Sequence, residues 1–304
     1  ASTLGLVDKA GAAGATLDEL VSSTGSSTSA LAQLLAHLVT IGVFELDPDT
    51  RRYRPTDLSQ QLTDNALLLD MKNAGGRAEL AFVDLLDTIA TGKPSYPKRY
   101  GRTFWEDLDS DPRLRSSFDA QMNWRFRTQA TQIAERFDWS RYPNIFDVGG
   151  GDGTLLTAIL QRHSTVRGTV LDLPPTSEAA GDRFAEAGLT DRASALGGSF
   201  FDPIPAGADV YILSDILHDW DDDHAAVILA ETARAAGGNT VVIIESIRGI
   251  SASTGVDLFM LMCFGSRERS MDELTDMAGQ VGLGLHTSTT VADGRTALEF
   301  RRTR

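Results

Sequence analysis

Several features that define other classes of protein are scarce in this sequence of 304 residues. Its one cysteine, Cys263, excludes an internal disulfide and a thiolate-rich metal site, so we expect no bound metal. No apolar run approaches the ~18 residues that a transmembrane helix needs. The N-terminus has no basic segment followed by an apolar stretch, which a signal peptide would show. A cytoplasmic protein without a membrane partner is therefore expected.

Positive charge is also in short supply. The chain holds 42 acidic residues against 28 Lys and Arg, for a formal net charge of -14. A phosphate backbone would be repelled on average, which argues against nucleic acid as a partner. A cationic ligand, in contrast, would be tolerated.

The first third of the chain has the pattern of a small helical unit. Thr16 and Glu19 have the spacing of a capping box at the start of a helix. Leucines then recur at the spacing of one helical face over residues 28–41. A short hairpin is expected to turn at residues 47–49. Helix, turn, helix and hairpin together indicate a winged-helix-like unit, which we place at residues 1–90.

A winged helix suggests DNA binding, but the local charge disfavours it. Residues 1–60 contain four basic and seven acidic residues, and the would-be recognition helix, residues 26–41, has no Lys or Arg. Phosphate contacts supply most nonspecific affinity for DNA. We therefore expect a dimerisation domain and a homodimer, and keep a DNA-binding regulator as the alternative.

The middle and the end of the chain differ in pattern. Residues 91–140 are predicted to form a helical connector whose large side chains either fill the core or line a pocket for a flat substrate; the pocket candidates here are Trp105, Phe118 and Met122. From residue 141 to 304, apolar β-branched runs alternate with helical stretches. This alternation predicts an α/β Rossmann-like domain with a parallel sheet.

The run FDVGGGDGTLL, residues 146–156, follows the first of these strands and opens a helix. Its glycines let the backbone turn sharply and approach a ligand at the carboxyl edge of the sheet. A dinucleotide fingerprint would have Gly or Ala at Thr154, and Asp152 stands where a pyrophosphate would sit. Asp172 ends the next strand, where a carboxylate can accept ribose hydroxyls. These residues favour a cofactor with adenosine and a positive charge but no phosphate.

Several runs in one order carry a resemblance to a known family: FDVGGGDGTLL, LDLP, GGSFFDPIP, ILHDWDDDHA, IIESI and FGSRERSMDEL. They resemble the plant caffeic-acid-type O-methyltransferases and their bacterial relatives that methylate polyketide and other antibiotic intermediates. The resemblance implies an S-adenosyl-L-methionine-binding Rossmann-like methyltransferase domain behind an N-terminal winged-helix-like dimerisation domain. It also implies S-adenosyl-L-homocysteine as the second product.

Carried over by position, the resemblance implies a set of cofactor contacts. Ser199 stands where the family usually has an Asp beside the adenine, so that contact would lose its charge. Arg115 resembles an arginine that bacterial members use near the cofactor's carboxylate. The implied cofactor-binding residues are Arg115, Asp147, Gly149, Gly151, Asp172, Leu173, Ser199, Phe200 and Ser214.

The resemblance also implies a catalytic group. His218 matches the family's general base, and Glu245 and Glu268 match two acids that orient it. A phenol of pKa ~10 is only ~0.1% ionised at pH 7, and a positioned histidine can take its proton as the oxygen attacks. From the residues alone, His218 could equally cap the helix that starts near Asp221. Likewise, Glu268 could be a salt-bridged surface residue between two arginines.

The predicted reaction is methyl transfer to a hydroxyl of an aromatic or polyketide-type small molecule in bacterial secondary metabolism. Further residues implied to face the substrate are Asp219, Met260 and Phe264. Since some relatives hydroxylate, decarboxylate or rearrange their substrates, non-methylating chemistry on the same cofactor site stays an alternative.

Overall fold

The computed structural model describes residues 1–303, apart from the side chain of Arg125, and divides the chain into two compact units. The first unit combines Ala1–Leu80 with Asp111–Phe118, and the second combines Ala81–Ser110 with Asp119–Arg304. The predicted connector, residues 91–140, is thus shared between the two units.

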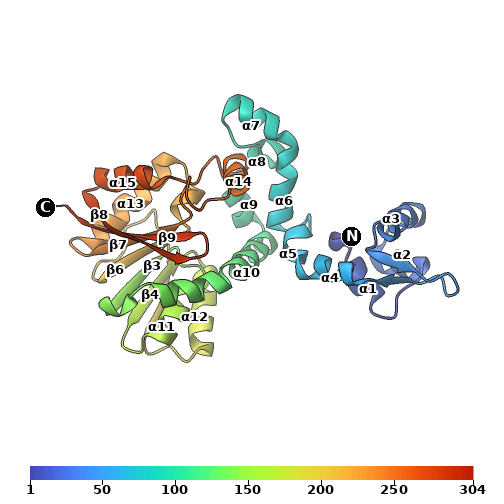
Figure 1. The fold of residues 1–304 in the computed structure, drawn as a ribbon, viewed down its shortest axis with the longest axis horizontal. Coiled ribbons are helices and arrows are strands. Elements are labelled where there is room, and N and C mark those ends of the chain that lie inside the picture. Colours follow the sequence, from blue (N-terminus) through green and yellow to red (C-terminus); the bar gives the residue numbers. More distant parts are fainter. Residues whose placement is uncertain (304) are drawn as a thin grey trace. The chain divides into compact units, whose positions relative to one another are not determined.

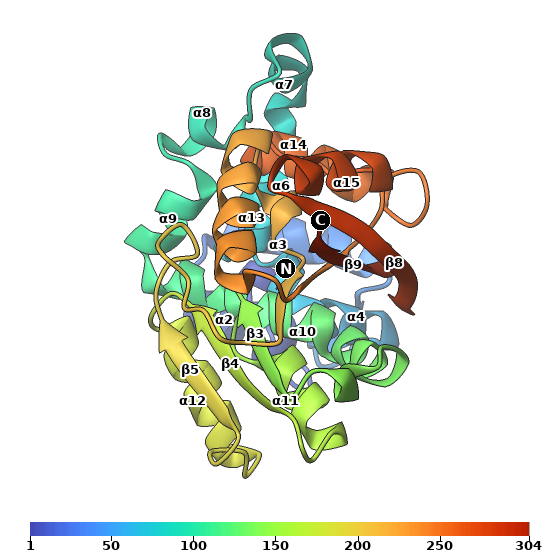
Figure 2. The ribbon, with the colours of Figure 1, turned by 90° about the vertical axis from the view of Figure 1, so that its left-hand side faces the viewer.

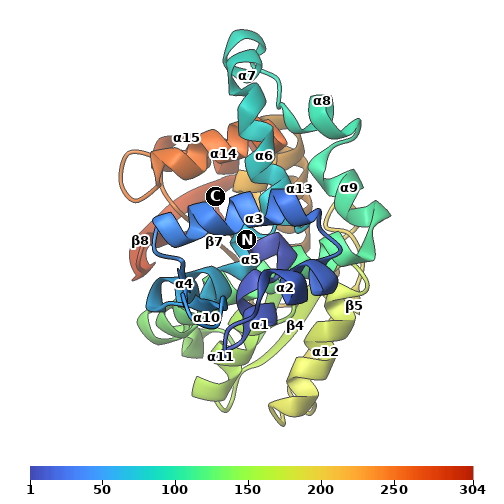
Figure 3. The ribbon, with the colours of Figure 1, turned by 90° about the vertical axis from the view of Figure 1, so that its right-hand side faces the viewer.

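The first unit begins with the helices and hairpin that the sequence predicts (Figure 1; Figure 3). Thr16 and Glu19 form the expected capping box, in which each side chain accepts a hydrogen bond from the other residue's backbone N–H. Leu31, Leu35 and Leu38 are buried on one face of the third helix. The elements are η1 (Ser2–Leu4), α1 (Leu6–Ala10), α2 (Leu17–Thr24), α3 (Thr28–Thr40), β1 (Phe44–Leu46), β2 (Tyr53–Pro55), α4 (Asp57–Asp64), α5 (Ala66–Leu69) and α6 (Ala74–Leu80).

The second unit opens with short helices that pack on a later helix of the same unit. Phe104 meets Phe264 at a ring-centre distance of 5.0 Å, and the backbone N–H of Ser95 donates to the carbonyl of Met262. These early elements are η2 (Ala81–Asp84), α7 (Leu85–Thr91), α8 (Tyr96–Tyr100), α9 (Phe104–Ser110), the later part of α10 (Pro112–Arg136) and η3 (Trp139–Arg141).

A seven-stranded sheet follows, with the order β5-β4-β3-β6-β7-β9-β8. All neighbouring pairs are parallel except the two that involve β9, which is antiparallel to both β7 and β8. The strands are β3 (Asn144–Val148), β4 (Arg167–Asp172), β5 (Ala193–Gly197), β6 (Val210–Ser214), β7 (Thr240–Glu245), β8 (Leu283–Ala292) and β9 (Arg295–Arg302). The helices around them are α11 (Thr154–Arg162), α12 (Thr176–Glu186), η4 (Leu217–Asp219), α13 (Asp222–Ala236), α14 (Thr254–Phe264) and α15 (Met271–Gln280).

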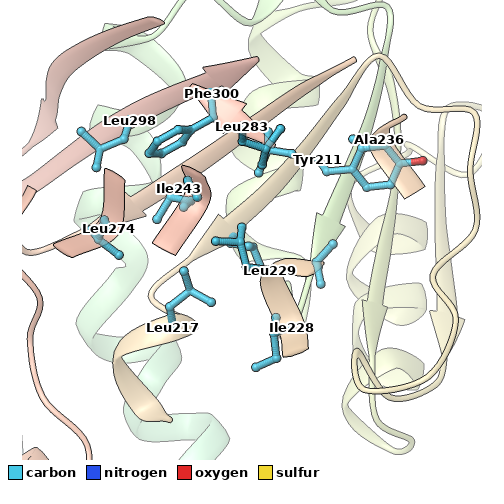
Figure 4. Close-up of a cluster of buried hydrophobic side chains, with 14 of the residues drawn as sticks. Tyr211, Leu217, Ile228, Leu229, Ala236, Ile243, Leu274, Leu283, Leu298 and Phe300 are labelled. Carbon is cyan, nitrogen blue, oxygen red and sulfur yellow. The ribbon is translucent and has the colours of Figure 1, made fainter. Parts of the chain in front are cut away.

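Both faces of the sheet are covered, which explains why its central strands are almost wholly apolar. Figure 2 shows α13 and α15 on one side of the sheet and α11 and α12 on the other. Alternate residues of a strand serve the two sides, so Ile243 packs with Leu229 and Leu274 while Ile244 packs with the other cluster. The first of these clusters is drawn in Figure 4.

The order of the strands in the sheet indicates where a ligand would bind. From β3 the chain continues to β4 and β5 toward one edge of the sheet, and from β6 it continues to β7 toward the other edge, so the strand order reverses between β3 and β6. Ligands of open α/β sheets bind outside the carboxyl ends of the strands at such a reversal. The residues that end β3, β4, β6 and β7 therefore define the candidate site. In the described part of the chain, no helix has the length and apolar character to cross a membrane.

Candidate active site

The loop after β3 requires glycine at the two positions predicted to lie against the cofactor. Gly149 and Gly151 have φ angles of 72° and 61°, in the left-handed region that side chains disfavour. A Cβ on Gly149 would lie 2.5 Å from Cδ1 of Ile216, whereas a Cβ on Gly151 would have no described residue other than its chain neighbours within 4 Å. The backbone at Gly149 is thus closely packed, and that at Gly151 faces open space.

Asp172 is held against this loop. One of its carboxylate oxygens accepts from the backbone N–H of Gly151 at 2.9 Å, and the other accepts from the N–H of Leu173 at 2.7 Å. The acid that ends β4 is therefore fixed beside the glycine loop, while the side chain of Leu173 is exposed.

Asp147 is the most unusual acid of this region. It is 1% exposed, and neither carboxylate oxygen has a hydrogen-bond partner among the described residues. Burial, together with the negative charge of Asp172, raises the pKa of Asp147 to about 7. Its Cγ would lie 2.6 Å from a Cβ on Gly150, so the carboxyl group is next to the loop backbone. A buried carboxyl group without a partner, which ionises near neutral pH, fits a positively charged ligand that would favour its charged form.

The structure changes the interpretation of Asp152. Sequence reasoning treats this carboxylate as a charge that would repel a pyrophosphate. In the structure it accepts from both the backbone N–H and the hydroxyl of Thr154 and forms an ion pair with Arg183 of α12. Arg183 largely offsets its charge, and its hydrogen bonds with Thr154 fix the turn that leads into α11, whose N-cap residue is Gly153.

The remaining cofactor candidates divide between the two units. Phe200 is close enough to Gly149 that its Cε1 would lie 3.3 Å from a Cβ there. The Ser199 hydroxyl oxygen accepts from the N–H of Phe201, and Ser214 ends β6 opposite Ile244 of β7. Arg115 lies in α10 within the first unit, so its contact with the cofactor stays a prediction.

His218 lies in η4, directly after β6, and is 6% exposed. Its Nδ1 is 3.4 Å from both carboxylate oxygens of Glu268, and its Nε2 is 3.5 Å from Oδ1 of Asp219. Its backbone N–H donates to Oε1 of Glu245 at 3.1 Å. Glu268 therefore contacts the imidazole ring, while Glu245 holds the backbone that carries it.

Both alternative interpretations of these residues are wrong. Helix α13 is capped by Asp221, whose side chain accepts from the N–H of His224, so His218 does not serve as its cap. Glu268 is 1% exposed and is not a surface residue. The second oxygen of Glu245, which is fully buried, has no partner among the described residues.

The electrostatics around His218 differ from those of an exposed histidine. Burial alone lowers the pKa of His218, but the carboxylates of Asp219, Glu268, Glu245 and Asp215 outweigh it and raise that pKa to about 10. Burial has the opposite effect on an acid: it raises the pKa of Glu245 to about 7, although the charge of His218 opposes this. Before any cationic ligand binds, the imidazole therefore holds a proton at neutral pH.

Aromatic rings gather beside this cluster. Trp105 is nearly parallel to Trp220, at 5.6 Å and 16°, and to Phe264, at 5.3 Å and 21°. We call these three residues the aromatic column. Trp220 follows His218 by two positions, and Phe264 ends α14, which packs against η4.

The other residues predicted to line the substrate pocket are not part of the aromatic column. Met260 is 5% exposed and belongs to the packed interior, Met122 is half-buried in α10, and Phe118 lies in the first unit.

Sequence reasoning missed Asp215 and Arg295, and it treated Arg269 only as a neighbour of Glu268. Within the described residues, no group of three or more His, Cys, Asp or Glu side chains is arranged to hold a metal ion.

The chain is similar to a known protein family and to individual proteins. Residues 82–284 match the family model described as the O-methyltransferase domain. The 2,7-dihydroxy-5-methyl-1-naphthoate 7-O-methyltransferase of Streptomyces carzinostaticus is 45% identical, over 95% of this chain and 89% of that protein. Aclacinomycin 10-hydroxylase RdmB of Streptomyces purpurascens is 41% identical, over 99% of this chain and 83% of that protein.

A solved structure agrees with these relatives. The O-methyltransferase NcsB1 from neocarzinostatin biosynthesis, crystallised with S-adenosylmethionine and 2-hydroxy-5-methyl naphthoic acid, superimposes with a TM-score of 0.91 at 43% identity. The match covers 99% of this chain and 94% of that one.

The fold and the site thus define a methyltransferase that uses S-adenosyl-L-methionine. The chain belongs to the O-methyltransferase domain family and is an S-adenosylmethionine-dependent O-methyltransferase related to enzymes of Streptomyces antibiotic biosynthesis. Its residues fit this cofactor: the unpartnered Asp147 carboxylate suits a positive charge, and Asp172 is fixed beside the glycine loop.

Proposed function

We propose that the chain methylates a hydroxyl group on a fused-ring aromatic acid of the naphthoate type. The observation that carries the proposal is the buried His218–Glu268 pair beside the aromatic column. The flat aromatic rings form a surface on which a flat substrate can stack, and the buried histidine can accept its proton. The dihydroxynaphthoate enzyme at 45% identity supports this substrate class.

In this proposal, the residues at the carboxyl ends of the strands hold the cofactor. Asp172, next to the exposed Leu173, would accept hydrogen bonds from the ribose hydroxyls, and Ser199 and Phe200 would flank the adenine. The backbone at Gly149, Gly151 and Ser214 approaches the rest of the molecule, with Asp147 near its positive charge. When bound, S-adenosyl-L-methionine supplies a methyl group that is already activated on a sulfonium.

His218 carries the proton transfer. Ionising a phenol at pH 7 costs about 4 kcal/mol, and a positioned base that shares the proton recovers part of this, typically ~10²- to 10⁴-fold in rate. Glu268, at Nδ1, orients the ring so that Nε2 takes the hydroxyl proton. Since the site's carboxylates keep His218 protonated, a positive charge bound at the same sheet edge is needed to lower its pKa.

The assembly that we propose is a homodimer. Val83, Leu86 and Ile89 recur at helical spacing along η2 and α7, and their exposed fractions are 75%, 80% and 61%. Such a row of exposed apolar side chains is typical of a surface that another chain covers. Light scattering on the wild type and on the variant Val83→Ser/Leu86→Ser/Ile89→Ser tests this. We expect a wild-type dimer and a monomeric variant, and a wild-type monomer would contradict the proposal.

The product identifies the reaction. The protein is incubated with methyl-labelled S-adenosylmethionine and a dihydroxynaphthoic acid, and the product is read by mass spectrometry. We expect a labelled O-methyl ether and no reaction of the substrate whose hydroxyls are already methylated. An oxidised product without label would instead place this chain's chemistry with that of the hydroxylase at 41% identity.

A further inference from the structure

We propose that two buried arginines, Arg269 and Arg295, are positioning residues that clamp the two ends of the segment carrying His218. This segment runs from Asp215, just after β6, to Asp222, the first residue of α13. The inference rests on the proposed role of His218 as the base.

Arg269 holds the later end. Its guanidinium donates to the carbonyl of Leu217 at 2.6 Å and to the carbonyl of Trp220 at 2.8 Å. It also donates to Oδ1 of Asp222, from Nη2 at 2.9 Å and from Nε at 3.1 Å. One side chain, 1% exposed, thus satisfies backbone carbonyls on both sides of His218. Because Arg269 follows Glu268 in the chain, one short segment orients both the imidazole ring and its backbone.

Arg295 holds the earlier end. Its Nε lies 2.7 Å and 3.0 Å from the two carboxylate oxygens of Asp215. The Asp215 backbone has a φ of 53°, a left-handed conformation that costs a residue with a side chain about 1 kcal/mol or more. Such a conformation persists when surrounding contacts fix it, and the ion pair with Arg295 is one of these contacts.

Arg295 is itself well fixed. It donates to Ser246, the residue after Glu245, and to the carbonyl of Gly294, and its guanidinium is 5.7 Å from the ring centre of Phe126. It is 8% exposed. It therefore joins the start of the His218 segment to the end of β7, which carries the second supporting acid.

The two arginines differ in what they do to the charge of the site. Asp219 on η4, Asp215 after β6, Glu245 on β7 and Glu268 before α15 all face His218 as carboxylates. Farther out, Asp257 of α14 accepts from the N–H of Glu268, and Asp222 is paired with Arg269 and Arg267. Arg295 offsets Asp215, so its removal leaves a buried anion unbalanced near the imidazole. The charge of Arg269 is matched by Asp222, and its main effect is on backbone geometry.

Steady-state kinetics over a pH series test the clamp. For Arg295→Met we expect kcat to fall about 10- to 100-fold with the cofactor KM nearly unchanged, because a misplacement of about 1 Å costs rates of this order. The acid limb of kcat/KM should move to higher pH, since an unbalanced Asp215 favours protonated His218. The double variant Asp215→Asn/Arg295→Met should return that limb to its wild-type position.

Two further variants separate charge from geometry. Arg295→Lys keeps the charge and loses the fixed donor geometry, so its acid limb should stay in place while kcat falls. Arg269→Met should lower kcat with little movement of the limb. Arg267→Met is the matched control: Arg267 also pairs with Asp222 but contacts no carbonyl next to His218 among the described residues, and its kcat should match the wild type.

The outcomes are distinct. A limb that does not move in Arg295→Met, or that Asp215→Asn does not restore, overturns the proposal, as does loss of kcat and cofactor affinity in equal measure. His218→Ala is included in the series. If that variant keeps wild-type turnover, the proposed base is wrong; if it is inactive while both arginine variants match the wild type, only the clamp is wrong.

Discussion

Replacing Asp147 by Asn tests how the cofactor end of the site is built. The wild-type carboxyl group is buried, has no hydrogen-bond partner among the described residues and has its pKa raised to about 7 by burial and by Asp172. The ordinary value of the group is 3.8. A carboxyl group of this kind opposes folding when it is ionised and supports ligand binding when the ligand is cationic.

The size and sign of the effect follow from this shift. Because the pKa in the folded state lies above the unfolded value, the penalty is absent below about pH 4, grows between pH 4 and 7 and is complete above pH 7. A shift of this size corresponds to roughly 4 kcal/mol at most. The Asn amide is also buried and costs about 1–3 kcal/mol. We expect Asp147→Asn to be more stable than the wild type by about 1–3 kcal/mol at pH 8. Near pH 4, where the wild-type carboxyl group is neutral and only the cost of burying the amide remains, the variant should be less stable by about 1–3 kcal/mol.

Thermal unfolding of the cofactor-free protein at several pH values measures this difference, and calorimetric titration measures cofactor affinity. Asp147→Asn should bind S-adenosylmethionine at least about tenfold more weakly, since it loses a buried carboxylate next to the loop that has no hydrogen-bond partner among the described residues. Asp191→Asn, which removes an exposed carboxylate before β5, is the control and should change neither quantity. A stability difference that does not depend on pH, or an unchanged affinity, would refute the reasoning.

Three shorter predictions concern other parts of the chain. Gly149→Ala places a Cβ 2.5 Å from Cδ1 of Ile216 in a left-handed backbone, so calorimetry should show weaker cofactor binding and thermal melting a loss of about 1–2 kcal/mol. Glu268→Gln removes one of the carboxylates that raise the pKa of His218, so the acid limb of its pH–rate profile should move to lower pH. Thr16→Ala removes the capping box of α2 and should cost about 1 kcal/mol by circular dichroism melting, with cofactor affinity unchanged.

The sequence predicts those parts of the fold that local rules determine. The Thr16 capping box depends on residues three apart, and the strands of the central sheet depend on continuous apolar runs that both faces bury. The glycine loop and Asp172 follow from the geometry of a strand-to-helix turn. These features need no knowledge of distant residues.

The parts that sequence reasoning missed join distant positions. Asp215 pairs with Arg295, 80 residues later, and Asp152 pairs with Arg183, 31 residues later. No spacing rule links such residues, because the sheet order decides which strand ends meet. The burial of Glu268 is a related case, since its two neighbouring arginines favour a surface position in sequence while the fold turns it toward His218.

The central claim is that His218 removes the hydroxyl proton during methyl transfer, and single-turnover rates of His218→Ala test it most directly. The assay compares this variant with the wild type on an ordinary naphthol and on an acidic one, with labelled cofactor and with cofactor affinity measured in parallel. The account predicts a loss of about 10²- to 10⁴-fold on the ordinary naphthol, a smaller loss on the acidic one, and nearly unchanged cofactor affinity. A His218→Ala variant that methylates the ordinary naphthol at near wild-type rate around neutral pH would contradict the account.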